Sequence, residues 1–337
     1  MIYKDIRTIT ISEVGHLLKK ILQKWKWIVS ICLIVGVSTV GYYTYSIYQF
    51  AHTISIADDT YHSPATDQEQ ATPVSIPKWD GKEPVYILLM GTDTRDADSN
   101  GRSDSMMVAT IDPVTKKAYI MSILRDTYVD IPGHGSSRLN AAYSYGGVEL
   151  AKETVSNLLG IPIDYYVTID FEGFKTLVDK IGGVEIDVEK DMNYTDGGDQ
   201  HRYDIHLTKG LQHLDGTHAL QYVRFRHDAT SDFTRTERQR KFLTALAAEL
   251  QSSTSIVKLP SILSSIAPYL HTNLSLTDMI KLSSLGLDIN LDKTEKLQIP
   301  PNHLLQEIKV KGASVIGVDN RKLHEYVQEQ LSESNDN

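Results

Sequence analysis

The chain has 337 residues, a net charge of −9, and one cysteine, Cys32. The length allows one large domain or two ordinary ones, and a lone cysteine excludes a disulfide framework and a cysteine-based zinc site. Residues 1–26 carry a net charge of +4 and the remainder carries −13. This balance argues against a general nucleic-acid binder, which needs a broad basic surface.

Residues 27–48 form a run without a single charged side chain. At about 1.5 Å per residue the run spans about 33 Å, enough for the hydrocarbon core of a bilayer. Tryptophans at its start and tyrosines at its end are typical of the two membrane interfaces. A cleaved signal peptide is the alternative, but the run is long and no small-residue cleavage site follows it. We therefore expect one transmembrane helix, with the basic N-terminus cytoplasmic and the body extracellular, at the cell membrane.

The rest of the chain divides at about residue 82. Residues 49–81 are rich in Asp, Ser, Thr, Gln and Pro without an apolar period, which indicates a linker. From there the pattern is globular, and no second linker or repeat interrupts it. The expected organisation is a cytoplasmic tail at 1–26, an anchor at 27–48, an extracellular linker at 49–81 and one domain at 82–333.

Strand-like and helix-like segments alternate through this domain. We expect strands at residues 85–90, 106–111, 118–124, 165–170, 184–188 and 296–299, of which the second and third form a hairpin. We expect helices at residues 147–159, 171–181, 235–251, 276–287 and 322–331. This pattern predicts an α/β fold with a central sheet covered on both faces.

The segment 224–241, RFRHDATSDFTRTERQRK, is unusually rich in arginine for an acidic protein. Thr234 stands three residues before Glu237, which is the spacing of a capping box and predicts a helix N-terminus there. On that helix Arg235, Arg238, Gln239 and Phe242 share a face, whereas Arg240 and Lys241 point elsewhere. Guanidinium groups match phosphate oxygens with paired hydrogen bonds, so the cluster suits a phosphate-rich ligand. The alternative interpretation is a solvated, charged helix face.

Two carboxylates and one more arginine are expected at the end of the sheet. Asp93 follows the first strand, Asp104 precedes the second, and Arg125 follows the third. If the second and third strands form a hairpin, Asp104 and Arg125 lie nearly opposite each other. Carboxylate oxygens suit Mg²⁺, which keeps places for phosphate and water. The alternative is that both aspartates are turn residues and that Arg125 belongs to a surface ion pair.

Six segments in order resemble the motifs of the LytR-CpsA-Psr family. They are LLMGTDTR, GRSDSMMVATID, SILRDTYVDIPG, RLNAAYSYGGVELA, KGLQHLDGTHALQYVRFRHD and DFTRTERQR. The resemblance implies an α-β-α sandwich with a central mixed sheet and an apolar pocket for a polyprenyl chain. It also implies a phosphotransferase that moves a phospho-linked anionic glycopolymer, of teichoic acid or capsule type, from a polyprenyl-pyrophosphate carrier to peptidoglycan.

The resemblance also implies residue roles. Asp93 and Asp104 match the family's Mg²⁺ ligands, with Mn²⁺ as a possible substitute. The pyrophosphate-binding residues of the family match Arg125, Arg224, Arg226, Arg235, Arg238 and Gln239. We expect Arg125 and Arg224 to stabilise the departing polyprenyl phosphate, and Asp232 to be the base that activates a sugar hydroxyl of the acceptor. Two other functions stay open: a phosphohydrolase acting on the same carrier, and a surface protein that binds glycopolymers without catalysis.

Overall fold

A computed structural model of the chain describes residues 41–43, 45–46, 48–49, 79, 81–92, 103–195, 201, 204–227 and 232–332. The side chains of residues 104, 253–257 and 276 are not described. Contacts divide the chain into two units, Met1–Gln49 and Phe50–Asn337. The described residues of the first unit are helical. In the described part of the chain no helix is long and apolar enough to cross a membrane, and the expected anchor at 27–48 lies mainly outside that part.

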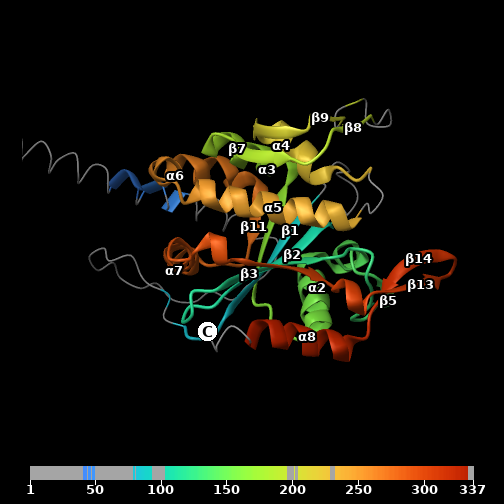
Figure 1. Cartoon of the computed structure of the whole chain (residues 1–337). Coiled ribbons are helices and arrows are strands. Elements are labelled where there is room, and N and C mark those ends of the chain that lie inside the picture. The colour runs from blue at the N-terminus through green and yellow to red at the C-terminus, as the bar shows by residue number, and fades with distance from the viewer. Residues whose placement is uncertain are drawn as a thin grey trace, which may run out of the picture. The chain divides into compact units, whose positions relative to one another are not determined.

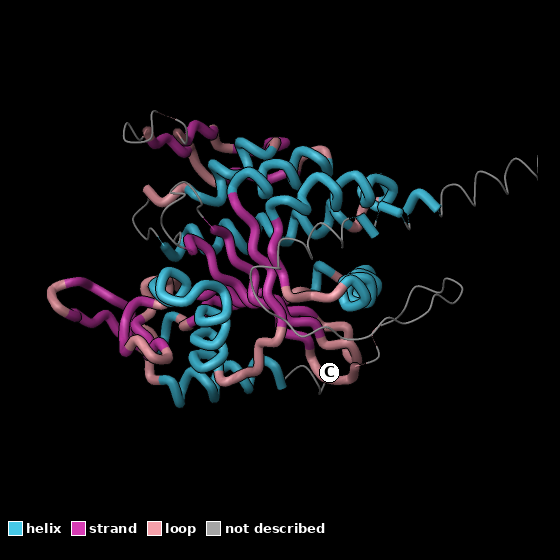
Figure 2. The backbone as a smooth tube through the Cα atoms, turned by 180° about the vertical axis from the view of Figure 1, so that it is seen from behind, coloured by secondary structure: helices cyan, strands magenta, loops and turns pink. Residues whose placement is uncertain are grey.

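A six-stranded mixed sheet lies at the centre of the second unit (Figures 1 and 2). Its strands run in the order β11 (Leu270–Thr272), β6 (Tyr165–Asp170), β1 (Val85–Thr92), β2 (Ser103–Ile111), β3 (Ala118–Ile123) and β12 (Glu295–Ile299). The β1–β2, β2–β3 and β11–β6 pairs are antiparallel, whereas β1–β6 and β3–β12 are parallel. The expected mixed α/β class, its central sheet and the β2–β3 hairpin are therefore confirmed.

Helices cover both faces of this sheet, because alternate strand residues point to opposite sides. Leu88 and Met90 of β1 belong to a buried cluster with Val155 of α2 and Leu323 of α8. Leu89 between them points to the other face, where it lines a cavity beneath α3, α4 and α5. Figure 1 shows the two helical layers on opposite sides of the strands. The helices are α2 (Ala141–Leu159), α3 (Phe171–Ile181), α4 (Gly216–Arg224), α5 (Asp232–Leu250), α6 (Ser253–Ile266), α7 (Leu276–Leu287) and α8 (Asn320–Ser332).

Short hairpins and single 3-10 turns complete the fold. The hairpins are β4 (Tyr128–Ile131) with β5 (Gly135–Arg138), β7 (Val184–Val188) with β10 (Gly210–Leu214), β8 (Met192–Tyr194) with β9 (Ile205–Leu207), and β13 (Gln306–Val310) with β14 (Ala313–Gly317). The turns are η2 (Ala267–Tyr269), η3 (Leu291–Lys293) and η4 (Asn302–Leu304). Apart from β7, these elements were not expected from sequence, because three- to five-residue strands carry little periodic signal.

The start of α5 differs from the expected capping box. The helix begins at Asp232, so Thr234 lies inside the first turn and does not cap it. Asp232 pairs with Arg235 one turn later, at 2.5 Å between Oδ1 and Nη2. A negative side chain in the first turn also interacts favourably with the positive end of the helix dipole. The helix therefore starts three residues before the expected position at Arg235.

Helix α2 also begins earlier than expected, at Ala141 instead of residue 147. It bends at Gly146 and Gly147, and Gly147 has a φ of 66° that glycine adopts without strain. The predicted helix therefore corresponds to the segment after the bend. The segment before the bend was missed because the two glycines look like a helix boundary.

The contact between α3 and α4 is close enough to require glycine. A Cβ at Gly216 would clash with the backbone carbonyl of Lys175 in α3. We expect Gly216→Ala to lower the free energy of unfolding by about 1–3 kcal/mol, because backbone cannot give way as a side chain can. Chemical denaturation measures this change. Gly286→Ala is the matched control: a Cβ there meets nothing within 4 Å, so it should be neutral or stabilising. Equal stabilities of the two variants would contradict the close packing of α4 on α3.

Candidate active site

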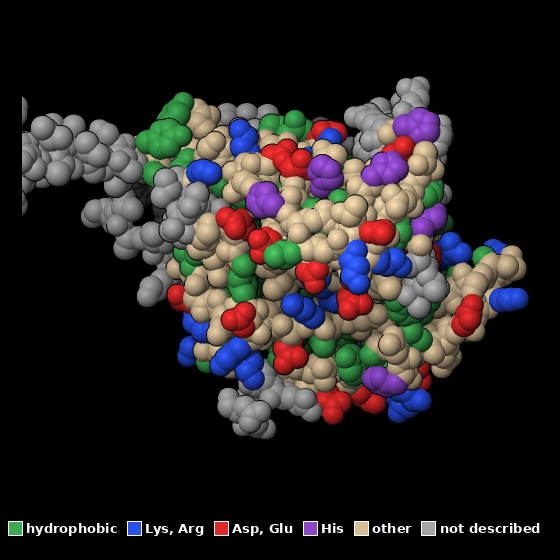
Figure 3. Space-filling view, turned by 45° about the horizontal axis from the view of Figure 1, so that its top comes forward, with side chains coloured by type: hydrophobic (Ala, Val, Ile, Leu, Met, Phe, Trp, Pro, Cys, Tyr) green, Lys and Arg blue, Asp and Glu red, His purple; other side chains and the backbone are tan. Residues whose placement is uncertain are grey.

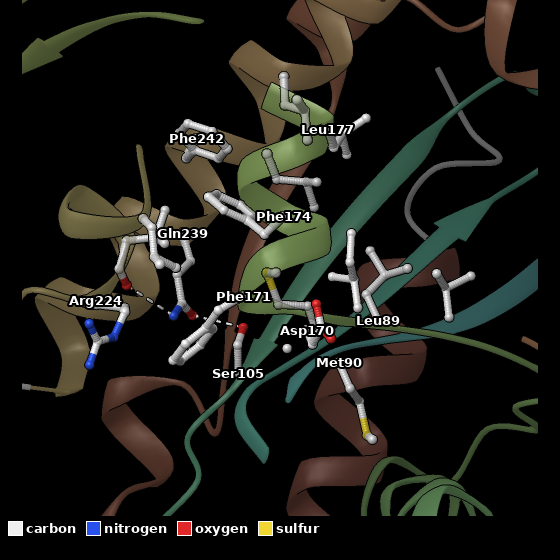
Figure 4. Close-up of a pocket in the computed structure, with 18 of the residues that line it drawn as sticks. Leu89, Met90, Ser105, Asp170, Phe171, Phe174, Leu177, Arg224, Gln239 and Phe242 are labelled. Atoms are coloured by element: carbon white, nitrogen blue, oxygen red, sulfur yellow. Dashed lines mark hydrogen bonds between the residues drawn. The ribbon is translucent and has the colours of Figure 1, made fainter. Parts of the chain in front are cut away.

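An apolar cavity of about 230 Å³ lies between the sheet and helices α3, α4 and α5 (Figure 4). Strands β1, β2 and β6 form its floor, through Leu89, Met107, Val167 and Ile169. The helices supply its apolar walls: Phe171, Phe174, Leu177, Leu220, Val223, Phe242, Leu243 and Leu246. Such a cavity suits a hydrocarbon chain, since each CH₂ group removed from water contributes about 0.8 kcal/mol. The apolar pocket implied by the sequence is therefore present.

Helix α3, which forms part of the cavity wall, follows β6 of the sheet without a loop. Asp170 ends β6 and caps α3, because its side chain accepts a hydrogen bond of 2.7 Å from the Gly173 N–H. The first and fourth helical residues, Phe171 and Phe174, then both face the cavity (Figure 4). Aromatic residues three positions apart lie on one helix face, and this spacing was the sequence signal that could have identified them.

One end of the cavity is polar. Arg224, at the end of α4, lines it, and its guanidinium carbon lies 5.0 Å from the centre of the Phe171 ring. Gln239 of α5 accepts a hydrogen bond of 3.1 Å from the Ser105 hydroxyl and donates one of 3.2 Å to the Val223 carbonyl. Figure 4 shows Arg224, Gln239 and Ser105 together at this end, away from Leu177. The cavity is thus amphipathic, apolar along its walls and cationic at its mouth.

A buried carboxylate joins the end of β3 to α5. Asp232 is 8% exposed, and its Oδ1 lies 2.5 Å from Arg235 Nη2 and 3.8 Å from Arg125 Nε. The backbone of Arg125 is fixed as well, because the Leu124 N–H bonds to Ile299 and the Asn140 N–H bonds to the Arg125 carbonyl. Asp232 therefore holds two cationic side chains beside each other. Its expected role as the base stays a prediction.

Backbone pairing places Asp104 at a break in the sheet. Gly91 of β1 pairs with Ser105, but the next residue, Thr92, pairs with Ser103, so the ladder skips Asp104. On the other side, β2 pairs with β3 from Met107 opposite Ser122 to Ile111 opposite Ala118, and this pairing ends before Asp104 and Arg125. The expectation that these two residues lie nearly opposite each other therefore stays a prediction. Bulges of this kind often re-aim a side chain next to an active site.

The metal site itself stays a prediction. Asp93 lies outside the described residues, one position beyond Thr92 at the end of β1. The side chain of Asp104 is not described either. Within the residues that are described, no group of three or more His, Cys, Asp or Glu side chains could hold a metal ion.

Arg238 faces the protein interior. Its side chain is 3% exposed, donates to Glu189 Oε1 at 3.0 Å and donates to the Phe225 carbonyl at 2.6 Å. The Tyr222 hydroxyl donates to the other Glu189 oxygen at 3.2 Å. Burial, followed by the charge of Glu189 and this hydrogen bond, raises the pKa of Tyr222 well above its ordinary value, so the donor stays protonated. Sequence reasoning missed Glu189, for which no motif gives a signal.

Two neighbouring residues of α5 therefore fix the segment that carries Arg224 and Arg226. Gln239 holds the Val223 carbonyl and Arg238 holds the Phe225 carbonyl, one on each side of Arg224. Arg226 is half-buried, and its Nε is buried without a hydrogen-bond partner in the described part of the chain. A buried donor without a partner costs about 1–3 kcal/mol, and an anionic ligand would satisfy it.

The expected shared face of α5 is confirmed, since Arg235, Arg238, Gln239 and Phe242 are all buried. Arg240 lies off this face as expected, but it is half-buried and not a fully exposed charge, and it lines a cavity together with residues of β12 and the segment after it. The alternative of a solvated charged face is wrong for α5.

An apolar cavity with Arg224 at one end, on a segment held by α5, is the kind of site that binds an apolar chain with an anionic head. The LytR_cpsA_psr family model matches residues 47–332. The chain therefore belongs to this family, as the motifs indicated.

Characterised relatives and solved structures support this assignment. The chain is 37% identical over 284 residues to the polyisoprenyl-teichoic acid–peptidoglycan teichoic acid transferase TagU of Bacillus mycoides, covering 84% of this chain and 88% of that protein. It superposes on the crystal structure of Bacillus subtilis TagV with a TM-score of 0.64 and 34% identity, over 76% of this chain and 98% of that one. It also resembles the family protein YwtF (TagT) with bound octaprenyl pyrophosphate lipid, with a TM-score of 0.58, 29% identity, and coverage of 77% and 94%.

The contacts of Arg238 generate a prediction. Arg238→Ala should lower the free energy of unfolding by about 1.5–3 kcal/mol, because charge-assisted hydrogen bonds to Glu189 and Phe225 are lost. Arg238→Lys should recover part of this loss, since lysine keeps the charge but not the planar fork. Denaturant unfolding measures the change, with the exposed Lys258→Ala as control. A variant of Arg238 that keeps full stability but loses ligand binding would favour the direct pyrophosphate contact expected from sequence.

Proposed function

We propose that this protein is a phosphotransferase that moves a phospho-linked anionic glycopolymer from a polyprenyl-pyrophosphate carrier to peptidoglycan. The observation that carries the proposal is the continuity between the apolar cavity and the cationic mouth at Arg224. A polyprenyl pyrophosphate has the same division into an apolar chain and an anionic head. The TagU relative is named as a teichoic acid transferase of this kind, and teichoic acid is accordingly the proposed polymer class, with capsule-type polymers as the alternative.

The arginines would bind and orient the pyrophosphate. Arg224 and Arg226 lie on a segment held from both sides by α5, and Arg125 and Arg235 are held by Asp232. Donors held in place before the substrate arrives stabilise developing charge without reorganisation. In this scheme Arg125 and Arg224 would neutralise the departing polyprenyl phosphate. Arg238 would act indirectly, by positioning its neighbours.

A divalent cation fits the same end of the sheet. Asp104 stands at the position that the β1–β2 ladder skips, Arg125 comes two residues after the end of β3, the next strand of the sheet, and Asp93 follows β1. Carboxylate oxygens are the ligands that Mg²⁺ prefers, so Asp93 and Asp104 would hold it, with Mn²⁺ as a substitute. When bound, the ion would add positive charge beside the pyrophosphate oxygens.

Asp232 is the proposed general base. It lies beside Arg125, and these two residues form the proposed reaction centre. Its ion pair with Arg235 supports a second role, in which the carboxylate mainly orients the two arginines. A phosphohydrolase would use the same residues with water as the acceptor. A purely binding protein would need the cavity for the donor, but it would not need a buried carboxylate between two arginines.

The proposed topology places the body outside the cell membrane, with the helix at 27–48 as its anchor and the tail at 1–26 in the cytoplasm. The charge difference between the two flanks of the uncharged run supports it. On the face drawn in Figure 3, Lys and Arg side chains lie among Asp and Glu side chains and form no continuous basic surface.

The function is tested with the full chain in detergent, a defined polyprenyl-pyrophosphate-linked glycan, peptidoglycan strands and Mg²⁺. Mass spectrometry should detect the glycan joined to the strand through a phosphodiester, together with released polyprenyl phosphate. Release of polyprenyl phosphate with free glycan phosphate, at the same rate with and without strands, would identify a phosphohydrolase. Donor binding with no turnover would identify a binding protein.

The cation is tested at Asp104. Asp104→Asn keeps the size of the side chain but weakens oxygen coordination, so Mn²⁺ affinity and transfer should both fall at least tenfold, by about 1.4 kcal/mol or more of binding free energy. Electron paramagnetic resonance of Mn²⁺ measures binding directly. The exposed Asp130→Asn is the control and should change neither quantity. Wild-type transfer in excess EDTA would refute the metal requirement.

A further inference from the structure

A second cavity, of about 380 Å³, lies beside α5. Its lining residues come from two places: Phe233, Thr234, Glu237 and Arg240 from α5, and Gln298, Asn302 and Leu305 from β12 and the segment after it. Its volume falls in the range of sites that take small ligands, about 300–1,000 Å³. None of the residue roles assigned above involves it.

The two cavities lie on opposite sides of α5. The first is lined by Gln239, Phe242, Leu243 and Leu246, and the second by Phe233, Glu237 and Arg240. At 100° per residue these sets occupy opposite faces of one helix. The strand order agrees, because the first cavity lies over β6, β1 and β2, whereas β12 borders the second at the far side of β3.

The proposed reaction centre, Asp232 with Arg125, adjoins the second cavity in the chain. Asp232 directly precedes Phe233 and Thr234, which line that cavity, and it pairs with Arg125 just after β3. The Leu124 N–H bonds to the Ile299 carbonyl, next to Gln298. A nucleophile must attack phosphorus roughly in line with the departing group. With the lipid in the first cavity, the second cavity is where an acceptor would approach from the opposite side.

The chemistry of the second cavity suits a charged glycan. The Gln298 amide nitrogen donates to Asn302 Oδ1 at 2.9 Å and to the Pro300 carbonyl at 3.1 Å. Within the described residues, the Gln298 amide oxygen and the Asn302 amide nitrogen are then available to a ligand. Arg240 has a buried Nη1 without a hydrogen-bond partner in the described residues. Burial lowers the pKa of Arg240, and Glu237 opposes that change. Phe233 and Leu305 add apolar surface for the carbon face of a sugar ring.

We propose that the second cavity is the acceptor subsite, and that it binds a peptidoglycan strand with N-acetyl groups facing Gln298 and Asn302 and a carboxylate facing Arg240. The inference rests on the proposed function, because that function supplies the acceptor. Arg240 then determines specificity for carboxylate-bearing strands over neutral glycans.

The test is direct binding of soluble, uncrosslinked peptidoglycan strands to the full chain by calorimetry. Arg240→Ala should weaken binding about tenfold or more and Asn302→Ala about threefold, in line with charged and neutral hydrogen bonds. Lys258→Ala, which removes an exposed cation on α6, should leave strand binding unchanged. Binding of a polyprenyl-pyrophosphate donor should stay at the wild-type level in all three variants. A neutral N-acetylglucosamine oligomer should bind more weakly and should not respond to Arg240→Ala.

The outcomes separate this inference from the function on which it rests. Wild-type strand affinity in both Arg240→Ala and Asn302→Ala would overturn the acceptor subsite, even if transfer proceeds normally. Equal losses for strand and donor would overturn it too, because the two sites would then not be separate. Strand binding with the expected losses, but with no transfer by the wild type, would support the subsite and refute the transferase. Asn302 is exposed, so its variant keeps the test valid if Arg240→Ala fails to fold.

Discussion

The structure depends on a helix that buries charged side chains. The inner face of α5 carries Asp232, Arg235, Arg238 and Gln239, where a helix of this length ordinarily buries apolar residues. A buried charge is costly unless it is paired and hydrogen-bonded. Each of these groups therefore requires a partner. Arg235 pairs with Asp232 within α5, whereas the other partners of Asp232, Arg238 and Gln239 lie on β2, on α4 and its end, and just after β3 and β7. Because its buried charges need these partners, α5 is held in one position relative to Asp232 and Arg125.

Much of the central fold could be predicted from the sequence, because it depends on local patterns. The continuous apolar run of β1 and the apolar period of α3 are complete within a few residues, so both elements were located closely. The pairing of β2 with β3 followed from a hairpin, in which register is set by the turn. The common face of Arg235 and Gln239 followed from helical spacing alone.

The remaining features depend on contacts between distant segments. Spacing placed Arg238 with the anion-binding residues, but its partner Glu189 stands 49 positions away and no local pattern marks it. Similarly, helical spacing placed Arg240 off the shared face but could not show that it is half-buried and lines a cavity with residues of β12 and the segment after it. The capping box at Thr234 was outweighed by the ion pair of Asp232 with Arg235. For Arg238 a tertiary contact overrode a correct local rule, whereas at the start of α5 a competing contact within the same helix did so.

The parallel pairing of β12 with β3 ties the reaction centre to the last part of the chain. Arg125 is fixed by a hydrogen bond from its neighbour Leu124 to Ile299, which lies 175 residues later. Contacts this distant in sequence form late, since a long loop must close first. In the proposed topology, with the body outside the membrane, the segment that carries Arg125 would emerge well before β12. The proposed site would then reach its final geometry only once translocation is nearly finished.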